Sequence, residues 1–217
     1  MNNAPIYTGK KLSLPSYLVK VGPWLAGTAF VVMAIGVAVW LLFGGNNPDA
    51  PLVGYWSFYG MSSVLLPIVL LFAVSAHELS HFAVLSLFKR QTAFVFLMGD
   101  PNRDYVGVGS LGGVPLRIGI GFGGWTEPVL QHDPSKAVVR FVAAAGLIGE
   151  FIVGTLAALF LGVKWTVFLH PIPLQMPLAH SIGVLTLVFV GGHIAAEATL
   201  GLFKKGSDVR VFLKGSY

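Results

Sequence analysis

The sequence predicts an all-α polytopic membrane protein with about four transmembrane helices and a re-entrant, glycine-rich β-hairpin between the second and third helices. Hydrophobic residues make up 55% of the 217 residues and charged residues make up 11%, against roughly 25% charged in an average soluble domain. The mean hydropathy is +0.77. A soluble enzyme needs more polar residues to cover its surface, and a disordered chain has low hydrophobicity. The composition therefore argues against a soluble enzyme and excludes a disordered chain.

Four apolar stretches are each long enough to cross a bilayer, which takes about 20 helical residues. The predicted spans, which together make one membrane domain over 24–203, are residues 24–43, 61–88, 137–163 and 179–203. Residues 1–23 are predicted to be a cytoplasmic segment, and residues 204–217 a basic cytoplasmic tail. Residues 106–125 are β-branched and glycine-rich. They are too broken for a helix, so we expect a β-hairpin whose backbone is shielded from lipid by protein.

The distribution of Lys and Arg predicts the orientation of the spans. Three lie in the N-terminal segment, five in the 89–136 loop and four in the tail, whereas the two other connections hold only Lys164. Cytoplasmic loops collect Lys and Arg, so both termini are expected on the cytoplasmic side, and the compact chain suggests a bacterial or archaeal cell membrane. This distribution accounts for the net charge of +5 without a nucleic-acid partner. The absence of cysteine excludes thiolate metal sites, so any metal must bind His, Asp or Glu.

The second predicted span carries the motif His77-Glu78-Leu79-Ser80-His81, which is an H-E-x-x-H pattern. Residues i and i+4 share one helix face, so both imidazoles can bind one Zn²⁺, with Glu78 beside it as general base for a bound water. Ionisable residues inside a span are costly and usually functional. The competing interpretation is a buried polar cluster, or a proton relay, that neighbouring helices satisfy.

The motif and three later stretches resemble the site-2 protease family of intramembrane zinc metallopeptidases. Residues 76–82, AHELSHF, resemble its active-site helix, and residues 118–129, IGIGFGGWTEPV, are similar to its glycine-rich β-segment. Residues 145–151, AGLIGEF, resemble its AGPxxNF segment, and residues 206–208, GSD, resemble the element that carries its third metal ligand. The resemblance implies a zinc-dependent intramembrane endopeptidase that hydrolyses peptide bonds in transmembrane segments of membrane-protein substrates.

The resemblance also implies roles for individual residues. Zn²⁺ is the expected cofactor and Glu78 the expected catalytic base. The metal ligands would be His77, His81 and Asp208. Candidate substrate-orienting groups are Gly123, Gly124 and Glu150, which stands where the family has Asn.

Depth in the membrane leaves alternatives for the third ligand open. His77 lies 11 residues before Phe88, or about 16 Å along a helix, whereas Asp208 follows two lysines that prefer the interface. An unwound or re-entrant end to the fourth span would bring Asp208 inward. If that span stays straight, His193 and Glu197 lie at a depth close to that of His77, on one helix face. Glu150 is a further candidate, although it fits better as a group that supports a metal ligand or orients a substrate.

Two functions of other classes compete with proteolysis. A catalytically silent zinc-binding membrane protein could bind or chaperone transmembrane clients with the same fold. A transporter or channel is the third class, although the sequence has no sign of inverted repeats. In the protease interpretation the partners are the lipid bilayer and an unwound transmembrane substrate, which could pair with the β-segment at 106–125 by β-augmentation.

Overall fold

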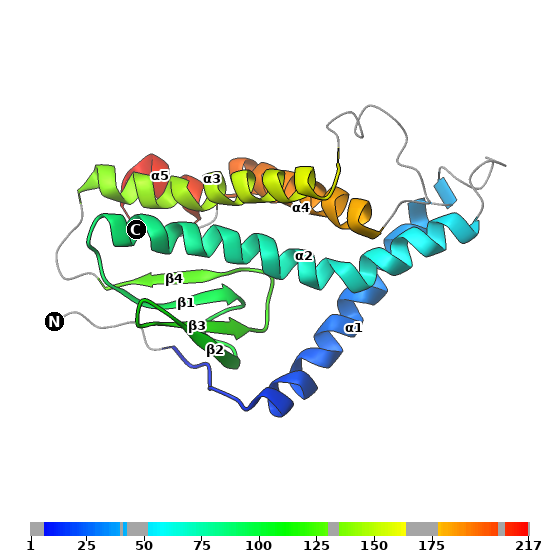
Figure 1. The fold of residues 1–217 in the computed structure, drawn as a ribbon, viewed down its shortest axis with the longest axis horizontal. Helices are drawn as coiled ribbons and strands as arrows, with labels where there is room; N and C mark the ends of the chain where they lie inside the picture. The colour runs from blue at the N-terminus through cyan, green and yellow to red at the C-terminus, as the bar shows by residue number, and fades with distance from the viewer. Residues whose placement is uncertain are drawn as a thin grey trace.

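A computed structural model gives the fold of the protein (Figure 1). It describes residues 7–39, 41–42, 52–129, 135–163, 178–203 and 207–216. In chain order the elements are α1 (Leu14–Val39), α2 (Leu52–Leu87), β1 (Thr92–Met98), β2 (Tyr105–Leu111), β3 (Val114–Gly119), β4 (Trp125–Pro128), α3 (Lys136–Phe160), α4 (Leu178–Thr199) and α5 (Asp208–Lys214).

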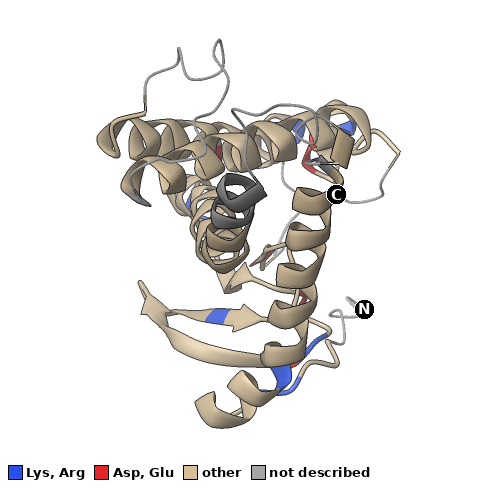
Figure 2. Cartoon of the chain, turned by 90° about the vertical axis from the view of Figure 1, so that its right-hand side faces the viewer, with Lys and Arg blue, Asp and Glu red and all other residues tan. Residues whose placement is uncertain are grey.

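Four of the described helices are long and apolar enough to cross a membrane. The candidate spans are Leu14–Ala38, Gly60–Leu87, Lys136–Phe160 and Ala179–Thr199. Figure 2 shows how few charged residues these helices carry. The prediction of an integral membrane protein is therefore supported by helix length and composition.

The all-α prediction is wrong, because the protein also contains a four-stranded mixed sheet with the strand order β2-β3-β1-β4. β2 and β3 form an antiparallel hairpin that turns at Gly112 and Gly113, both at positive φ. β1 pairs with β3 in parallel and with β4 antiparallel. The predicted hairpin at 106–125 covers the β2–β3 hairpin but omits β1 and nearly all of β4. A short apolar run such as β1 does not show which distant strand will pair with it.

The sheet packs against α2, and α2 in turn separates the sheet from α3, α4 and α5 (Figure 1). Strand β1 lies beside α2, and its central residues Val95 and Phe96 are fully buried. This order of layers leaves α2 in contact with the sheet on one side and with helices on the other. The motif side chains of α2, His77, Glu78 and His81, are buried in this arrangement.

The ends of the helices differ from the predicted spans. α1 begins at Leu14 rather than at residue 24, since a proline at position 15 is tolerated in a first helical turn. α2 begins at Leu52 rather than at 61. The predicted tail contains helix α5, whose first turn starts from the N-cap Ser207. The predictions made for residues 1–6, 164–177 and 204–206 lie outside the described residues.

Residues before α1 lie along the sheet rather than extending away from it. The backbone N–H of Leu12 donates to the Tyr105 carbonyl at 2.8 Å, and that of Tyr105 donates to the Lys10 carbonyl at 3.0 Å. Lys20 forms an ion pair with Asp104, whose other oxygen accepts from the Lys10 backbone N–H. The Lys20 ammonium, and then this backbone N–H, lower the pKa of Asp104. The N-terminal segment is thus attached to the start of β2.

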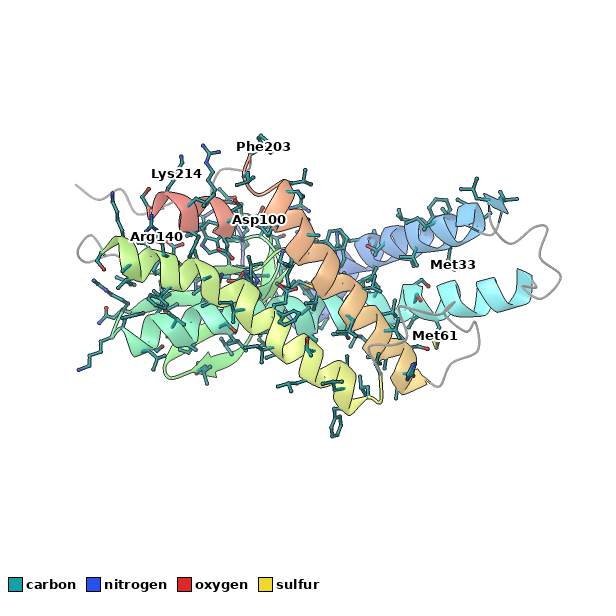
Figure 3. The ribbon with its side chains drawn as sticks, turned by 90° about the horizontal axis from the view of Figure 1, so that it is seen from above. Met33, Met61, Asp100, Arg140, Phe203 and Lys214 are labelled. Atoms are coloured by element: carbon teal, nitrogen blue, oxygen red, sulfur yellow. The ribbon has the colours of Figure 1, made fainter. Side chains whose placement is uncertain are left out.

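Charge is unevenly distributed along the molecule. Arg140 and Lys214 lie toward one end of the long axis, where α3 begins and α5 packs on it, whereas Met33 and Met61 lie toward the other (Figure 3). Such an asymmetry is typical of membrane proteins, in which Lys and Arg collect on one side of the bilayer.

Candidate metal centre

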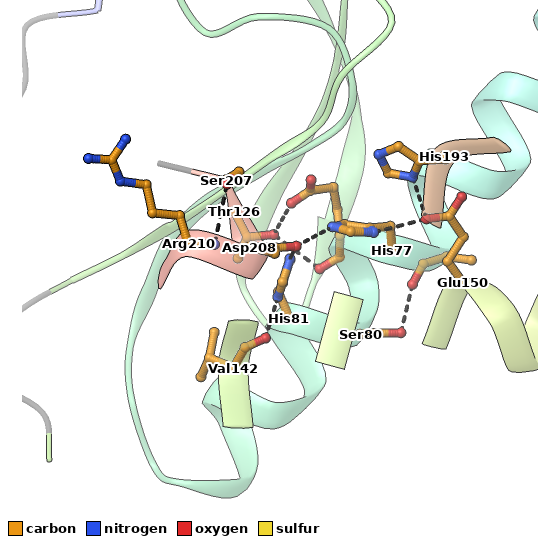
Figure 4. Close-up of polar contacts among 12 residues, drawn as sticks. His77, Ser80, His81, Thr126, Val142, Glu150, His193, Ser207, Asp208 and Arg210 are labelled. Atoms are coloured by element: carbon orange, nitrogen blue, oxygen red, sulfur yellow. Dashed lines mark hydrogen bonds and ion pairs between the residues drawn. The ribbon is translucent and has the colours of Figure 1, made fainter. Parts of the chain in front are cut away.

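One turn of α2 presents the predicted motif to the interior of the protein (Figure 4). The side chains of His77, Glu78 and His81 are all buried. The two imidazole rings lie with their centroids 4.8 Å apart, nearly perpendicular to each other. The helical spacing expected from the sequence therefore brings both rings to one site.

The Nδ1 atom of each ring already has a partner. His81 Nδ1 donates to the Val142 carbonyl on α3 at 2.6 Å, and a carbonyl oxygen can only accept. His77 Nδ1 lies 3.0 Å from Glu150 Oε2, also on α3. Because a carboxylate likewise only accepts, both Nδ1 atoms carry hydrogen. In the neutral rings, both Nε2 atoms then hold lone pairs.

Asp208 faces these two Nε2 atoms. Its Oδ2 lies 2.8 Å from His77 Nε2 and 3.2 Å from His81 Nε2. Three acceptors so close together require a positive charge between them, either a proton on an imidazole or a cation. Tetrahedral zinc with bonds of about 2.0–2.1 Å places its ligand atoms roughly 3.3 Å apart. The two Nε2–Oδ2 distances therefore lie close to the spacing that a zinc ion would need between these ligand atoms.

Helix α5 positions Asp208 by packing on α3. Val211 of α5 is buried against Val139 and Ala143. Arg140 donates to the carbonyls of Phe212 and Leu213 at the C-terminal end of α5, at 3.0 and 3.4 Å. The chain turns after α4 ends at Thr199, so Asp208 is returned to the level of the imidazoles, as the unwound-end alternative required.

A glycine on α3 makes room for the site. A Cβ atom on Gly146 would lie 2.5 Å from His81 Nε2 and 2.7 Å from His77 Cε1. Real Cβ atoms essentially never show such contacts, so any side chain at this position would displace the rings. Gly146 lies in the AGLIGEF segment, and its role was not recognised from the sequence.

Glu78 points away from α3, toward the sheet. The Thr126 hydroxyl on β4 lies 2.8 Å from Glu78 Oε2 and 3.0 Å from the Glu78 backbone oxygen. The predicted Gly124 also lies here, since a Cβ on it would be 2.6 Å from Glu78 Oε1. The other predicted glycine, Gly123, contacts the chain through its carbonyl, which accepts a hydrogen bond from the Gly99 backbone N–H at 2.5 Å. Thr126 was missed in the sequence, where only its place after a glycine-rich turn signals it.

The alternatives for the third ligand lie elsewhere. His193 Nδ1 contacts Glu150 Oε2 at 2.7 Å, on the Nδ1 side of His77. Glu197 lies one turn further along α4, and its Oε2 is buried without a hydrogen-bond partner among the described residues. Among the described residues, ligand atoms also lie within 4.8 Å of one another in the group of His77, Glu78 and His81 and in the group of His77, Glu150 and His193. Asp208 is the group that faces the Nε2 atoms of both motif histidines.

Beyond β4, a second polar cluster involves the N-terminal segment. The Tyr7 hydroxyl donates to Glu127 Oε2 at 2.5 Å, and Trp125 Nε1 donates to the same oxygen at 2.7 Å. Burial, and then the hydrogen bond to Glu127, raise the pKa of Tyr7. This contact links the start of the chain to the strand that touches Glu78.

Comparison of the chain with protein-family models, curated proteins and solved structures gave no match. The fold and the site define a class in physical terms: a protein with four candidate membrane-spanning helices, a mixed sheet, and buried His and carboxylate groups that could hold a metal ion. Its function is inferred from those groups.

Proposed function

We propose that the protein is a zinc-dependent intramembrane endopeptidase that cleaves transmembrane segments of membrane-protein substrates. One observation carries this proposal. Both Nδ1 atoms of the motif histidines are occupied by acceptors, while both Nε2 atoms face the Asp208 carboxylate at 2.8 and 3.2 Å. A buried polar cluster with no ion would leave these acceptors facing one another unless an imidazole were protonated.

The ion would be held by His77 Nε2, His81 Nε2 and Asp208 Oδ2. Three protein ligands and one open position are typical of a catalytic zinc, whereas a structural zinc has four protein ligands. Zinc bound in this way supplies a Lewis acid that polarises a carbonyl and lowers the pKa of a coordinated water to about 7.

Glu78 would act as the general base. Its carboxylate takes a proton from the attacking water and passes it to the leaving amine. The Thr126 hydroxyl, 2.8 Å from Oε2, fixes one oxygen of the carboxylate. Oε1, on the side of the carboxylate that lies against Gly124, then remains for the water. Thr126 acts through Glu78 and is therefore a positioning residue.

The substrate would have to unwind, because a helix keeps its carbonyls in hydrogen bonds. We place its extended segment along β4, which lies at an edge of the sheet and carries Thr126. This shifts the expected pairing from residues 106–125 to Trp125–Pro128. Main-chain pairing with a sheet edge holds a peptide in the extended form that hydrolysis needs. An unpaired edge in a membrane is costly, so an edge here needs a partner.

The test compares Glu78→Gln with wild type in proteoliposomes containing a pool of single-span peptides with Gly or Pro near the centre. Glu78→Gln should keep one zinc per chain, measured by elemental analysis, and lose cleavage, measured by mass spectrometry. Asp100 is an exposed loop carboxylate, so Asp100→Asn is the matched control and should keep both the zinc and the cleavage. Cleavage retained by Glu78→Gln, or no zinc in wild type, would overturn the proposal. Zinc without any cleavage by wild type would favour the catalytically silent client-binding protein.

A further inference from the structure

Glu150 joins two histidines from different helices through one oxygen. Its side chain is fully buried on α3. Oε2 lies 3.0 Å from Nδ1 of His77 on α2 and 2.7 Å from Nδ1 of His193 on α4 (Figure 4). The His193–Glu150–His77 chain therefore reaches the metal centre from the side opposite to Asp208.

The two motif histidines are supported differently. His81 is oriented by the Val142 carbonyl, which is fixed by the backbone of α3. His77 is oriented by a carboxylate at the end of a flexible side chain, and the terminal torsion of Glu is broad. Some other contact must therefore fix the Glu150 carboxylate before it can fix His77.

His193 is the contact that can do so. The second oxygen of Glu150, Oε1, is buried with no hydrogen-bond partner in the described part of the chain. His193 is itself held by Phe189, whose ring stacks on it with centroids 6.1 Å apart and an interplanar angle of 19°. The plane of the His193 ring thus sets the position of Oε2.

We infer that His193 is a positioning residue that acts through Glu150 to hold His77 in the tautomer and ring orientation that leave Nε2 directed at the metal. The inference rests on the proposed zinc function. It assigns α4 a role in metal binding without making it a source of ligands. Of the two roles expected for Glu150, the inference favours support of a metal ligand, since a fully buried carboxylate on the Nδ1 side of His77 cannot reach a substrate.

Loss of such an outer partner typically weakens metal affinity by about 10–100-fold. His193→Phe keeps a planar ring beside Phe189 but removes the donor, and should weaken zinc binding by that factor. His193→Asn places an amide N–H the same number of bonds from Cα as Nδ1, and should restore the affinity to within a few-fold. His180→Phe, on the same helix, is the matched control and should bind zinc like wild type.

The experiment measures zinc affinity of the purified full chain by competition with a chelating dye, zinc stoichiometry, and the visible spectrum of the Co²⁺-loaded protein. The His193→Phe spectrum should differ from that of wild type, and the His193→Asn spectrum should match it. If His193→Phe does not fold, His193→Ala replaces it in the same assays. Unchanged affinity and spectrum in the donor-less variant would overturn the inference.

A zinc stoichiometry that depends on His193 would also overturn the inference that His193 is a positioning residue. Ligand atoms of His77, Glu150 and His193 lie within 4.8 Å of one another, so this group could bind an ion itself. Two zinc ions per chain in wild type, falling to one in both His193→Phe and His193→Asn, would make His193 a ligand. An absence of zinc from wild type would instead contradict the proposed function, so the two failures are distinguishable.

Discussion

The candidate site has two halves on opposite sides of α2, a helical half around the two imidazoles and a sheet half around Glu78. The two halves differ in the groups that surround them. On the helical side, the imidazoles meet α3 and α5, and the identified partners are a backbone carbonyl, the carboxylates of Glu150 and Asp208, and a glycine. On the sheet side, Glu78 meets a single hydroxyl on an edge strand, Thr126, and the glycine-rich turn before it. The helical half is held between packed helices, whereas the sheet half lies next to β4, a strand at the edge of the sheet. The comparison suggests that metal affinity and catalytic rate can be changed separately.

The largest expected effect is on the helical half, at Asp208. Asp208→Ala removes the group that faces both Nε2 atoms. Loss of an outer partner costs about 10–100-fold in metal affinity, so loss of a ligand should cost more than roughly 100-fold. Dye competition in detergent measures this. Glu197→Gln should leave affinity unchanged; if it abolishes binding while Asp208→Ala does not, the third ligand is Glu197.

Gly146→Ala should have the next largest effect. The new methyl group would lie 2.5 Å from His81 Nε2 and force the rings apart. Overpacking of this kind costs about 1–3 kcal/mol, so zinc affinity should fall roughly 10–100-fold. Gly27→Ala on α1 is the control, because nothing lies within 4 Å of its Cβ position. Equal zinc affinity in both variants would show that α3 does not approach the imidazoles this closely.

A substitution on the sheet half should change rate and leave metal binding intact. Thr126→Val keeps the volume of the side chain but removes the hydroxyl 2.8 Å from Glu78 Oε2. A hydrogen bond to a charged group contributes about 1.5–3 kcal/mol, so cleavage should slow about tenfold or more at unchanged zinc content. Thr186→Val, whose hydroxyl donates to the Ile182 carbonyl within α4, is the control. Zinc loss in Thr126→Val would show that the two halves are not separable.

The smallest expected effect lies outside the site, at the ion pair of Lys20 and Asp104. The pKa of Asp104 is lowered in the folded protein, so the pair stabilises the fold above the ordinary Asp pKa of about 3.9. That stabilisation is lost as the pH falls through the lowered folded pKa. Asp104→Asn should therefore unfold at a slightly lower temperature than wild type at pH 7, and the difference should shrink toward pH 3. A difference that grows as the pH falls would contradict this assignment.

What the sequence could predict follows from how local each feature is. The motif residues His77, Glu78 and His81 are four positions apart at most, and helical geometry alone brings the two rings together. The β2–β3 hairpin is equally local, which explains why residues 106–125 were predicted as strands. The pairing of β1 with β3 is parallel and cannot be deduced from a neighbouring turn. The depth argument allowed Asp208, but only packing of α5 on α3 shows where its carboxylate points.

The contact of His193 with Glu150 likewise joins two distant elements and could not be predicted from the sequence. Its position on α4 gives its depth but not its partner. His193 and Glu197 share one face of α4, but the sequence does not show which neighbouring helix that face meets. The structure turns His193 toward Glu150, and so converts a candidate ligand into a candidate support for another residue.

The attachment of the N-terminal segment has a consequence for synthesis of the protein. Tyr7 and Glu127 are 120 positions apart, and Thr8 and Asn102 are 94 apart. Contacts between such distant residues close slowly, and the contact of Tyr7 cannot form until the ribosome has reached Glu127. The segment around Tyr7 therefore reaches its place only after β4 has been made, and a bulky tag fused ahead of Tyr7 would have to be carried to the strand that contacts Glu78.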